Sequence, residues 1–262
     1  MNKLSRYIGK HQPEIPSMPD YTRPHPHTSI GIEVELEGIT DYHVEWKRWN
    51  TASDGSLYDG VEFVSEPVWG TAITDALQEL QGFLNGQKPH ISFRTSVHIH
   101  MNVLDMTKES LANLLKINLM YEKALFRLHS EWGRESCIFC VPASESVLIR
   151  QAYATLLSNL EKGFVRDDYL PCKYSATNIN SLARFGTVEF RHMGGTADTN
   201  KISDWINILL QMKTSAILGA KVSDPSDVWG EYESSLDIKP ADLKLGRELV
   251  NNLELGEYVC AE

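Results

Sequence analysis

The clearest pattern in the chain is the strict alternation of apolar and acidic residues over residues 30–38. The segment reads Ile-Gly-Ile-Glu-Val-Glu-Leu-Glu-Gly, and this period of two is typical of a β-strand. One face of the predicted strand is apolar, and the other carries Glu33, Glu35 and Glu37. Three carboxylates on one buried face would repel one another. On this strand alone, an acidic face that meets water is therefore the favoured interpretation.

Further strands with one polar face are predicted over residues 61–65, 92–103, 175–180 and 186–193, with a turn at 183–186 between the last two. Each has apolar residues at alternate positions, which places the intervening polar residues together on the other face. The polar residues on these faces include Glu62, His98, His100, Asn102, Glu189 and Arg191.

Apolar residues at helical spacing predict helices over residues 71–85, 107–130, 144–162 and 203–218, and a shorter one over about 240–252. Strands and helices follow one another without the regular alternation of a doubly wound fold. The sequence therefore predicts an α+β protein with an antiparallel sheet and helices packed on one side.

The first 28 residues differ from the rest because they contain five prolines and little periodicity. We predict an extended arm over residues 1–28 and a single catalytic domain with C-terminal helices over residues 29–262. His25 and His27 lie in the arm and are interpreted as solvated.

Composition excludes several classes of protein. The chain has 25 Lys and Arg against 35 Asp and Glu, a formal net charge of −10, which argues against a nucleic-acid partner. No apolar run is long enough to cross a membrane, and the N-terminus lacks a secretory pattern, so a cytoplasmic location is expected.

Four scattered cysteines indicate free thiols. Cys137 and Cys140 have C-x-x-C spacing without the βαβ pattern of a redox site.

Taken together, the polar strand faces favour a shared site over separate solvated surfaces. Glutamate oxygens combined with an imidazole suit Mg²⁺ or Mn²⁺. Neither paired cysteines nor a His-Glu-x-x-His motif supports a structural or protease zinc. Glu189 and Arg191 could form a plain ion pair, or a metal ligand beside a phosphate clamp.

The order of these motifs resembles the amidoligase family, grouped with glutamine synthetase and glutamate–cysteine ligase as carboxylate–amine ligases. The resemblance covers about residues 29–196. It rests on Gly-Ile-Glu33-Val-Glu35, then Asp54-Gly-Ser with Glu62-Phe-Val-Ser, then Val-His98-Ile-His100, and finally Asn178 with Gly-Thr-Val-Glu189-Phe-Arg191.

The resemblance implies a curved half-barrel sheet like the catalytic domain of glutamine synthetase, with ATP and two divalent metal ions as cofactors. It assigns one ion to Glu35, Glu62 and Asp54, and the other to Glu33, His98 and Glu189. It places Arg191 at the phosphate or the developing charge. Further phosphate or substrate contacts are assigned to His100, Lys173, Asn178 and Arg184.

The implied reaction is an ATP-dependent, ADP-forming joining of a carboxylate to an amine through an acyl phosphate. Asp54 or Glu37 is a candidate to deprotonate the amine, and residues 131–146 are either a lid or an ordinary connection between helices. The substrates include small amino acids, a peptide or a protein, and the oligomeric state stays open. The alternatives are a metal-dependent hydrolase and an inactive binding module with the same fold.

Overall fold

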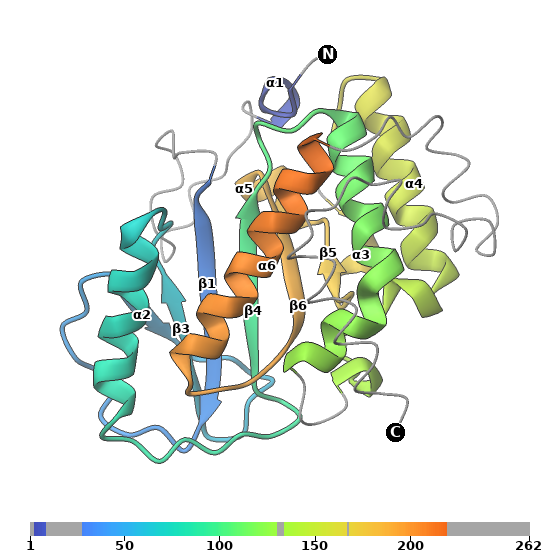
Figure 1. The fold of residues 1–262 in the computed structure, drawn as a ribbon. Coiled ribbons are helices and arrows are strands. Elements are labelled where there is room, and N and C mark those ends of the chain that lie inside the picture. The colour runs from blue at the N-terminus through green and yellow to red at the C-terminus, as the bar shows by residue number, and fades with distance from the viewer. Residues whose placement is uncertain (1–2, 9–27, 130–133, 167, 219–262) are drawn as a thin grey trace.

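A six-stranded antiparallel sheet forms the centre of the protein in the computed structural model, which describes residues 3–8, 28–129, 134–166 and 168–218 (Figure 1). The strand order is β2-β3-β1-β4-β6-β5, and the sheet is open. The strands are β1 (Ile30–Glu37), β2 (Trp49–Ala52), β3 (Gly60–Ser65), β4 (Ser96–Asn102), β5 (Thr177–Asn178) and β6 (Thr187–Gly194). The predicted α+β class is confirmed, whereas the likeness to the glutamine synthetase half-barrel stays a prediction.

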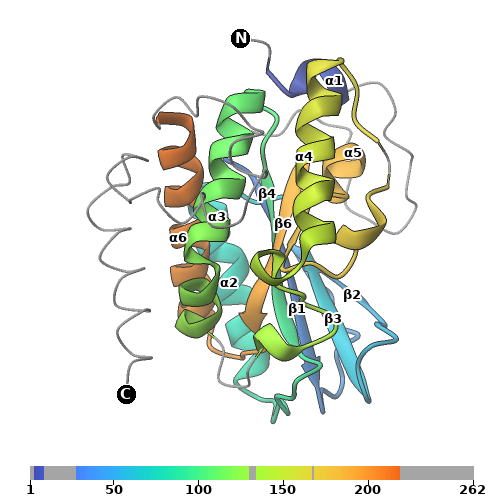
Figure 2. The same cartoon turned by 90° about the vertical axis from the view of Figure 1, so that its right-hand side faces the viewer.

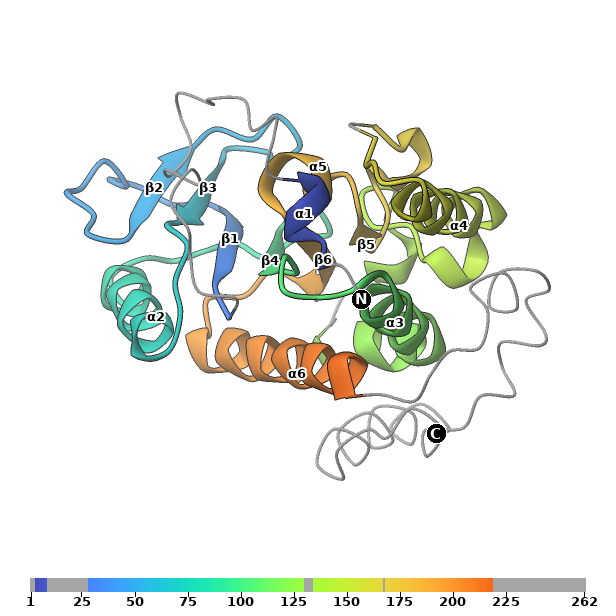
Figure 3. The same cartoon turned by 90° about the horizontal axis from the view of Figure 1, so that it is seen from above.

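The helices are unequally distributed over the two faces of the sheet. They are α1 (Ser5–Ile8), α2 (Thr71–Leu84), α3 (Lys108–His129), α4 (Val147–Glu161), α5 (Ser181–Phe185) and α6 (Thr199–Leu218). Helices α2, α3 and α6 cover one face, α5 lies on the other side, and α4 lies beyond the β5 edge (Figures 2 and 3). Much of the second face is therefore left to the polar side chains of the strands.

Period-two alternation explains how the strands divide between the two faces. Val34 of β1 and Ile99 of β4 are fully buried in one core with Leu80 of α2 and Trp205 of α6. Glu33 of β1, one residue from Val34, must then point away from these helices. The same hydrophobic burial that stabilises the sheet thus brings its acids and imidazoles to one face.

A β-bulge interrupts the pairing of β4 with β6. Val97 pairs with Met193 and Ile99 with Phe190, so two residues of β6 lie opposite His98. One of them, His192, is fully buried and packs against Phe190 and Trp205 on the helix side. Alternation from Phe190 already places Arg191 on the polar face and His192 in the core, and the bulge lets Met193 join the core beside Val97.

Several elements differ from the sequence-based expectations. Residues 183–186, predicted as a turn, belong largely to helix α5, which ends at Gly186 with a φ of 69°. Strand β2 was not predicted, and residues 5–8 of the predicted arm form α1. The predicted helix over residues 240–252 lies outside the described residues. Within the described ranges, no helix has the length and apolar character needed to cross a membrane.

Candidate active site

Three carboxylates meet near one end of the polar face. Glu35 of β1 pairs directly with Glu62 of β3, and Asp54 reaches them from the loop between β2 and β3. One oxygen of each of the three lies within 4.8 Å of the others. We call Glu35, Asp54 and Glu62 the carboxylate cluster. The three residues predicted to share one metal ion are therefore neighbours in space.

The carboxylate cluster is electrostatically costly in the absence of a cation. The pKa of Glu62 is raised from 4.5 to about 8, first by burial and then by the negative charges of Glu33, Glu35 and Asp54. Repulsion between close carboxylates disfavours their ionisation, and a bound divalent cation would reverse this effect. Mg²⁺ and Mn²⁺ prefer oxygen ligands, so three carboxylates that repel one another in this way are suited to bind either ion.

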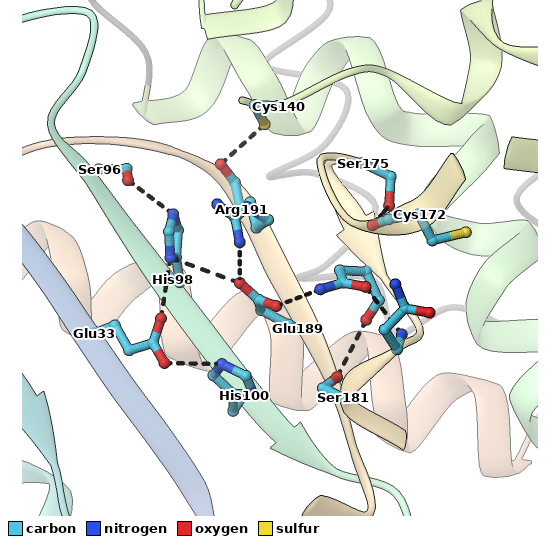
Figure 4. A network of polar contacts seen from close by, with 12 residues as sticks. Glu33, Ser96, His98, His100, Cys140, Cys172, Ser175, Ser181, Glu189 and Arg191 are labelled. Carbon is cyan, nitrogen blue, oxygen red and sulfur yellow. Dashed lines mark hydrogen bonds and ion pairs between the residues drawn. The ribbon is translucent and has the colours of Figure 1, made fainter. Parts of the chain in front are cut away.

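A second group combines two carboxylates with an imidazole. Oxygens of Glu33 and Glu189 and a ring nitrogen of His100 lie within 4.8 Å of one another (Figure 4). His100 Nε2 is 3.1 Å from Glu33 Oε1. We call Glu33, His100 and Glu189 the histidine cluster. The prediction placed His98 with these two acids, whereas His100, predicted as a phosphate or substrate contact, lies among them.

Positive charge surrounds the acids of the histidine cluster. Arg191 donates to Glu189 Oε1 at 2.6 Å, and the Asn178 amide donates to Glu189 Oε2 at 2.7 Å. His100 and His98 hold the pKa of Glu33 well below its ordinary value, although burial acts in the opposite direction. The pKa of Glu189 is also lowered, against the effect of burial, chiefly by Arg191 and then by His100. Both carboxylates are therefore kept ionised.

His98 lies between the two clusters. Its Nδ1 is 3.1 Å from Glu33 Oε2, 3.6 Å from Glu189 Oε1 and 3.8 Å from Glu35 Oε1. The imidazole is 2% exposed, so these approaches are shielded from water. His98 thus contacts both acids that the sequence predicted as its partners, together with one member of the carboxylate cluster.

A cavity of about 690 Å³ adjoins the histidine cluster. Its size lies within the usual range for small-molecule sites. The predicted contacts that line this cavity, besides the two acids of the cluster, are His100, Lys173, Asn178, Arg184 and Arg191. The Arg191 guanidinium lines the cavity and is held in place by Glu189, which suits a side chain that binds an anionic ligand.

Glu37 holds the loop that carries Asp54. Its Oε1 accepts from the backbone N–H of Tyr58 at 2.7 Å, and its Oε2 is 3.3 Å from His90 Nδ1. Arg94, which lies in the neighbouring loop, donates a hydrogen bond of 2.8 Å to the carbonyl oxygen of Ser56. The position of Asp54 therefore depends on contacts outside the carboxylate cluster itself.

The candidate lid over residues 131–146 packs against the back of β6 in its described part, residues 134–146. Arg134 Nε and Cys140 Sγ both donate to the carbonyl oxygen of Arg191, at 3.2 and 3.0 Å. Such contacts fit an ordinary connection between helices, and closure over the site stays a prediction. Cys137, Cys140 and Cys172, the described cysteines, are free thiols.

Comparison with known proteins supports a family assignment. A family model described as "Putative amidoligase enzyme" matches residues 40–212, which is more than half of the chain. The chain belongs to the amidoligase family. No curated protein matches it. The matched segment contains β2 to β6 and most site residues of this amidoligase, whereas β1, with Glu33 and Glu35, precedes it.

Several residues at the site of this amidoligase were not predicted from its sequence. Asp168, Leu170, Asn180, Ser181 and Phe185 also line the cavity. Asp168 and Leu170 come from the segment before β5 and Ser181 and Phe185 from helix α5, so no alternating pattern marks them, whereas Asn180 ended the strand predicted over residues 175–180. A second group consists of hydroxyl residues beside the histidines. Ser96 lies 2.8 Å from His98 Nε2, and Thr187 lies 3.1 Å from His100 Nδ1.

Proposed function

We propose that this amidoligase-family chain is an ATP-dependent ligase that forms an amide bond between a carboxylate and an amine, through an acyl phosphate and with two divalent metal ions. The observation that carries the proposal is that the histidine cluster lines a cavity together with Lys173, Arg184 and Arg191 and is joined through His98 to the carboxylate cluster. Carboxylates can hold the metal ions that accompany a nucleoside triphosphate, and Lys and Arg side chains can bind its phosphates.

The metal ions would be held by the two clusters. Glu35, Asp54 and Glu62 offer only carboxylate oxygens, whereas Glu33 and Glu189 are joined by an imidazole from His100 or His98. Bound Mg²⁺ or Mn²⁺ would neutralise phosphate charge. We assign one ion to each cluster.

The residues around the cavity would stabilise the transferring phosphoryl group. In the first step, a carboxylate oxygen of the acid substrate forms a bond to the γ-phosphorus of ATP, and the bond to ADP breaks. Arg191 is held by Glu189 at 2.6 Å and lines the cavity, so its guanidinium is preorganised for an anion. Lys173 and Arg184 supply further positive charge at the rim of the cavity.

In the second step, the amine nitrogen attacks the acyl carbon, the bond to phosphate breaks, and the amine loses a proton. Glu37 and Asp54 are the two candidate bases. Glu37 is buried and both of its oxygens are engaged, by Tyr58 and by His90, whereas Asp54 is half-buried and accepts from the backbone N–H of Ser56 through Oδ1. The greater exposure of Asp54 favours it as the acceptor of the proton.

One assay separates this proposal from its two rivals. Purified protein is incubated with Mg·ATP, pooled carboxylic acids or peptides, and pooled amines, and ADP, phosphate and condensed products are counted by mass spectrometry. The ligase predicts equal amounts of ADP, phosphate and amide. Turnover without ATP would instead indicate a metal-dependent hydrolase. Nucleotide binding without ADP release would indicate an inactive binding module.

A further inference from the structure

Ser96 forms a bridge between the carboxylate cluster and His98 that the proposed reaction does not explain. Ser96 is fully buried near the start of β4, two residues before His98 on the same face of the strand. Its Oγ donates a hydrogen bond to Glu35 Oε2. The same Oγ lies 2.8 Å from His98 Nε2, a contact that Figure 4 shows.

The hydrogen positions in this bridge follow from the donor inventory. A serine hydroxyl has one proton, and an ionised carboxylate can only accept. The proton of Ser96 is therefore directed to Glu35, which leaves a lone pair of Oγ facing His98. For a hydrogen bond to exist at 2.8 Å, His98 Nε2 must carry the proton that is donated to Ser96.

The opposite ring nitrogen faces the acids. His98 Nδ1 lies 3.1 Å from Glu33 Oε2 and 3.6 Å from Glu189 Oε1, so in the metal-free protein it donates a proton to Glu33, and it has the position of a third ligand once a cation displaces that proton. Histidine ligands of metal ions usually donate their other N–H to a fixed acceptor, which sets the tautomer and the ring orientation. Ser96 is placed to be that acceptor.

We propose that Ser96 is a positioning residue that keeps the proton on His98 Nε2 and thereby presents Nδ1 to the metal ion held by Glu33 and Glu189. The same hydroxyl fixes Glu35, so one side chain links a ligand of each cluster. This inference assigns His98 Nδ1 to the metal, rests on the proposed two-metal function, and gives Ser96 a role in metal affinity without contact to substrate.

The first test measures the tautomer and needs neither metal nor activity. The ring nitrogens of His98 are observed by ¹⁵N NMR in the full chain and identified by the signal that is lost in His98→Asn. At a pH where the ring is neutral, the expected result is a proton on Nε2 in the wild-type protein and a larger share of protons on Nδ1 in Ser96→Ala, where only Glu33 is left to accept. An unprotonated Nε2 in the wild type, or an identical spectrum in the variant, would overturn the proposal.

The second test measures Mn²⁺ affinity by calorimetry. Loss of such an outer hydrogen bond typically weakens metal binding by about ten- to a hundredfold, and we expect this loss for Ser96→Ala. Ser96→Thr keeps the hydroxyl and should retain affinity. Ser65→Ala is the matched control, because Ser65 is a fully buried strand serine whose Oγ accepts from the N–H of Ile32.

The outcomes separate this inference from the proposed function. Equal Mn²⁺ affinity for Ser96→Ala and the wild type contradicts the role of Ser96, even if the protein is a ligase. Absence of Mn²⁺ binding to the wild type contradicts the two-metal function, while the NMR result still decides whether Ser96 sets the tautomer. If Ser96→Ala does not fold, Ser96→Cys replaces it in both tests.

Discussion

The two clusters lie side by side on one face of the sheet but differ in how their charge is balanced. In the carboxylate cluster, the groups that act most strongly on Glu62, apart from burial, are other acids, and its pKa rises to about 8. In the histidine cluster, Arg191, His100 and His98 offset the burial of the acids, and the pKa of Glu33 is lowered.

This difference teaches that the two clusters contribute oppositely to the stability of the metal-free protein. Buried acids that are paired with cations are held in place by those pairs, whereas crowded acids without them oppose folding. The histidine cluster is consequently preformed, and the carboxylate cluster would gain most from a bound cation.

Replacement of Glu189 by glutamine should have the largest effect. The variant keeps an acceptor for Arg191, so it should fold, but it removes a carboxylate from the histidine cluster. We expect ATP-dependent amide formation to fall by about 10²- to 10³-fold, the usual cost of losing one preorganised electrostatic group. Steady-state assays with ADP detection measure this loss. Glu161→Gln, at an exposed ion pair with Lys108, is the control and should keep full activity.

Glu33→Gln and Glu62→Gln should change the stability of the metal-free protein in opposite directions. Glu33→Gln weakens contacts with His98 and His100 and should lower the free energy of unfolding by about 1–3 kcal/mol. Glu62→Gln removes repulsion and should leave this free energy unchanged or raised. Urea titrations in the presence of a chelator compare the two. Equal destabilisation by both variants would refute the contrast between the clusters.

Sequence alternation predicted which strand residues share a face, because apolar burial against α2, α3 and α6 fixes that face for the whole strand. It could not predict that His100 and His98 both lie 3.1 Å from Glu33, because the register and the β-bulge at β6 depend on tertiary packing. Asp54 was predicted only through the family resemblance. Alternation places Ser96 on the same strand face as His98 but gives it no role, and Asp168 carried no signal, since isolated polar residues are common on loops.

Replacement of Lys173 or Arg184 by alanine should have a smaller effect. Both side chains are exposed at the rim of the cavity, where water screens their charge. We expect each variant to raise the KM for ATP or for the acid substrate by roughly fivefold, equivalent to about 1 kcal/mol, with little change in kcat. Lys162→Ala, at the end of α4, is an exposed control. A fall in kcat with an unchanged KM would contradict a binding role.

The pH dependence of stability is the most subtle consequence. Folded protein holds a proton on Glu62 up to a pKa of about 8, so the contribution of Glu62 to metal-free stability should fall as pH rises from about 4.5 towards 8. Burial lowers the pKa of His192 to about 3, so this ring adds a rise of stability with pH up to about 6.5. The pKa of His100 is raised to about 9 by Glu33 and Glu189 against the effect of burial, and this stabilisation is lost only between 6.5 and 9. Glu62→Gln should therefore shift the slope between pH 5 and 6.5 in the positive direction relative to the wild type, as followed by thermal melting. Equal slopes in the variant and the wild type would contradict the proton held by Glu62.

The most direct measurement of the central claim is the stoichiometry of Mn²⁺ binding, counted by electron paramagnetic resonance. We predict two ions per wild-type chain, one ion in Glu189→Gln and one in Glu62→Gln, because each variant disables a different cluster. A wild-type chain that binds no Mn²⁺, or two variants that both retain two ions, would contradict the assignment of one metal ion to each cluster.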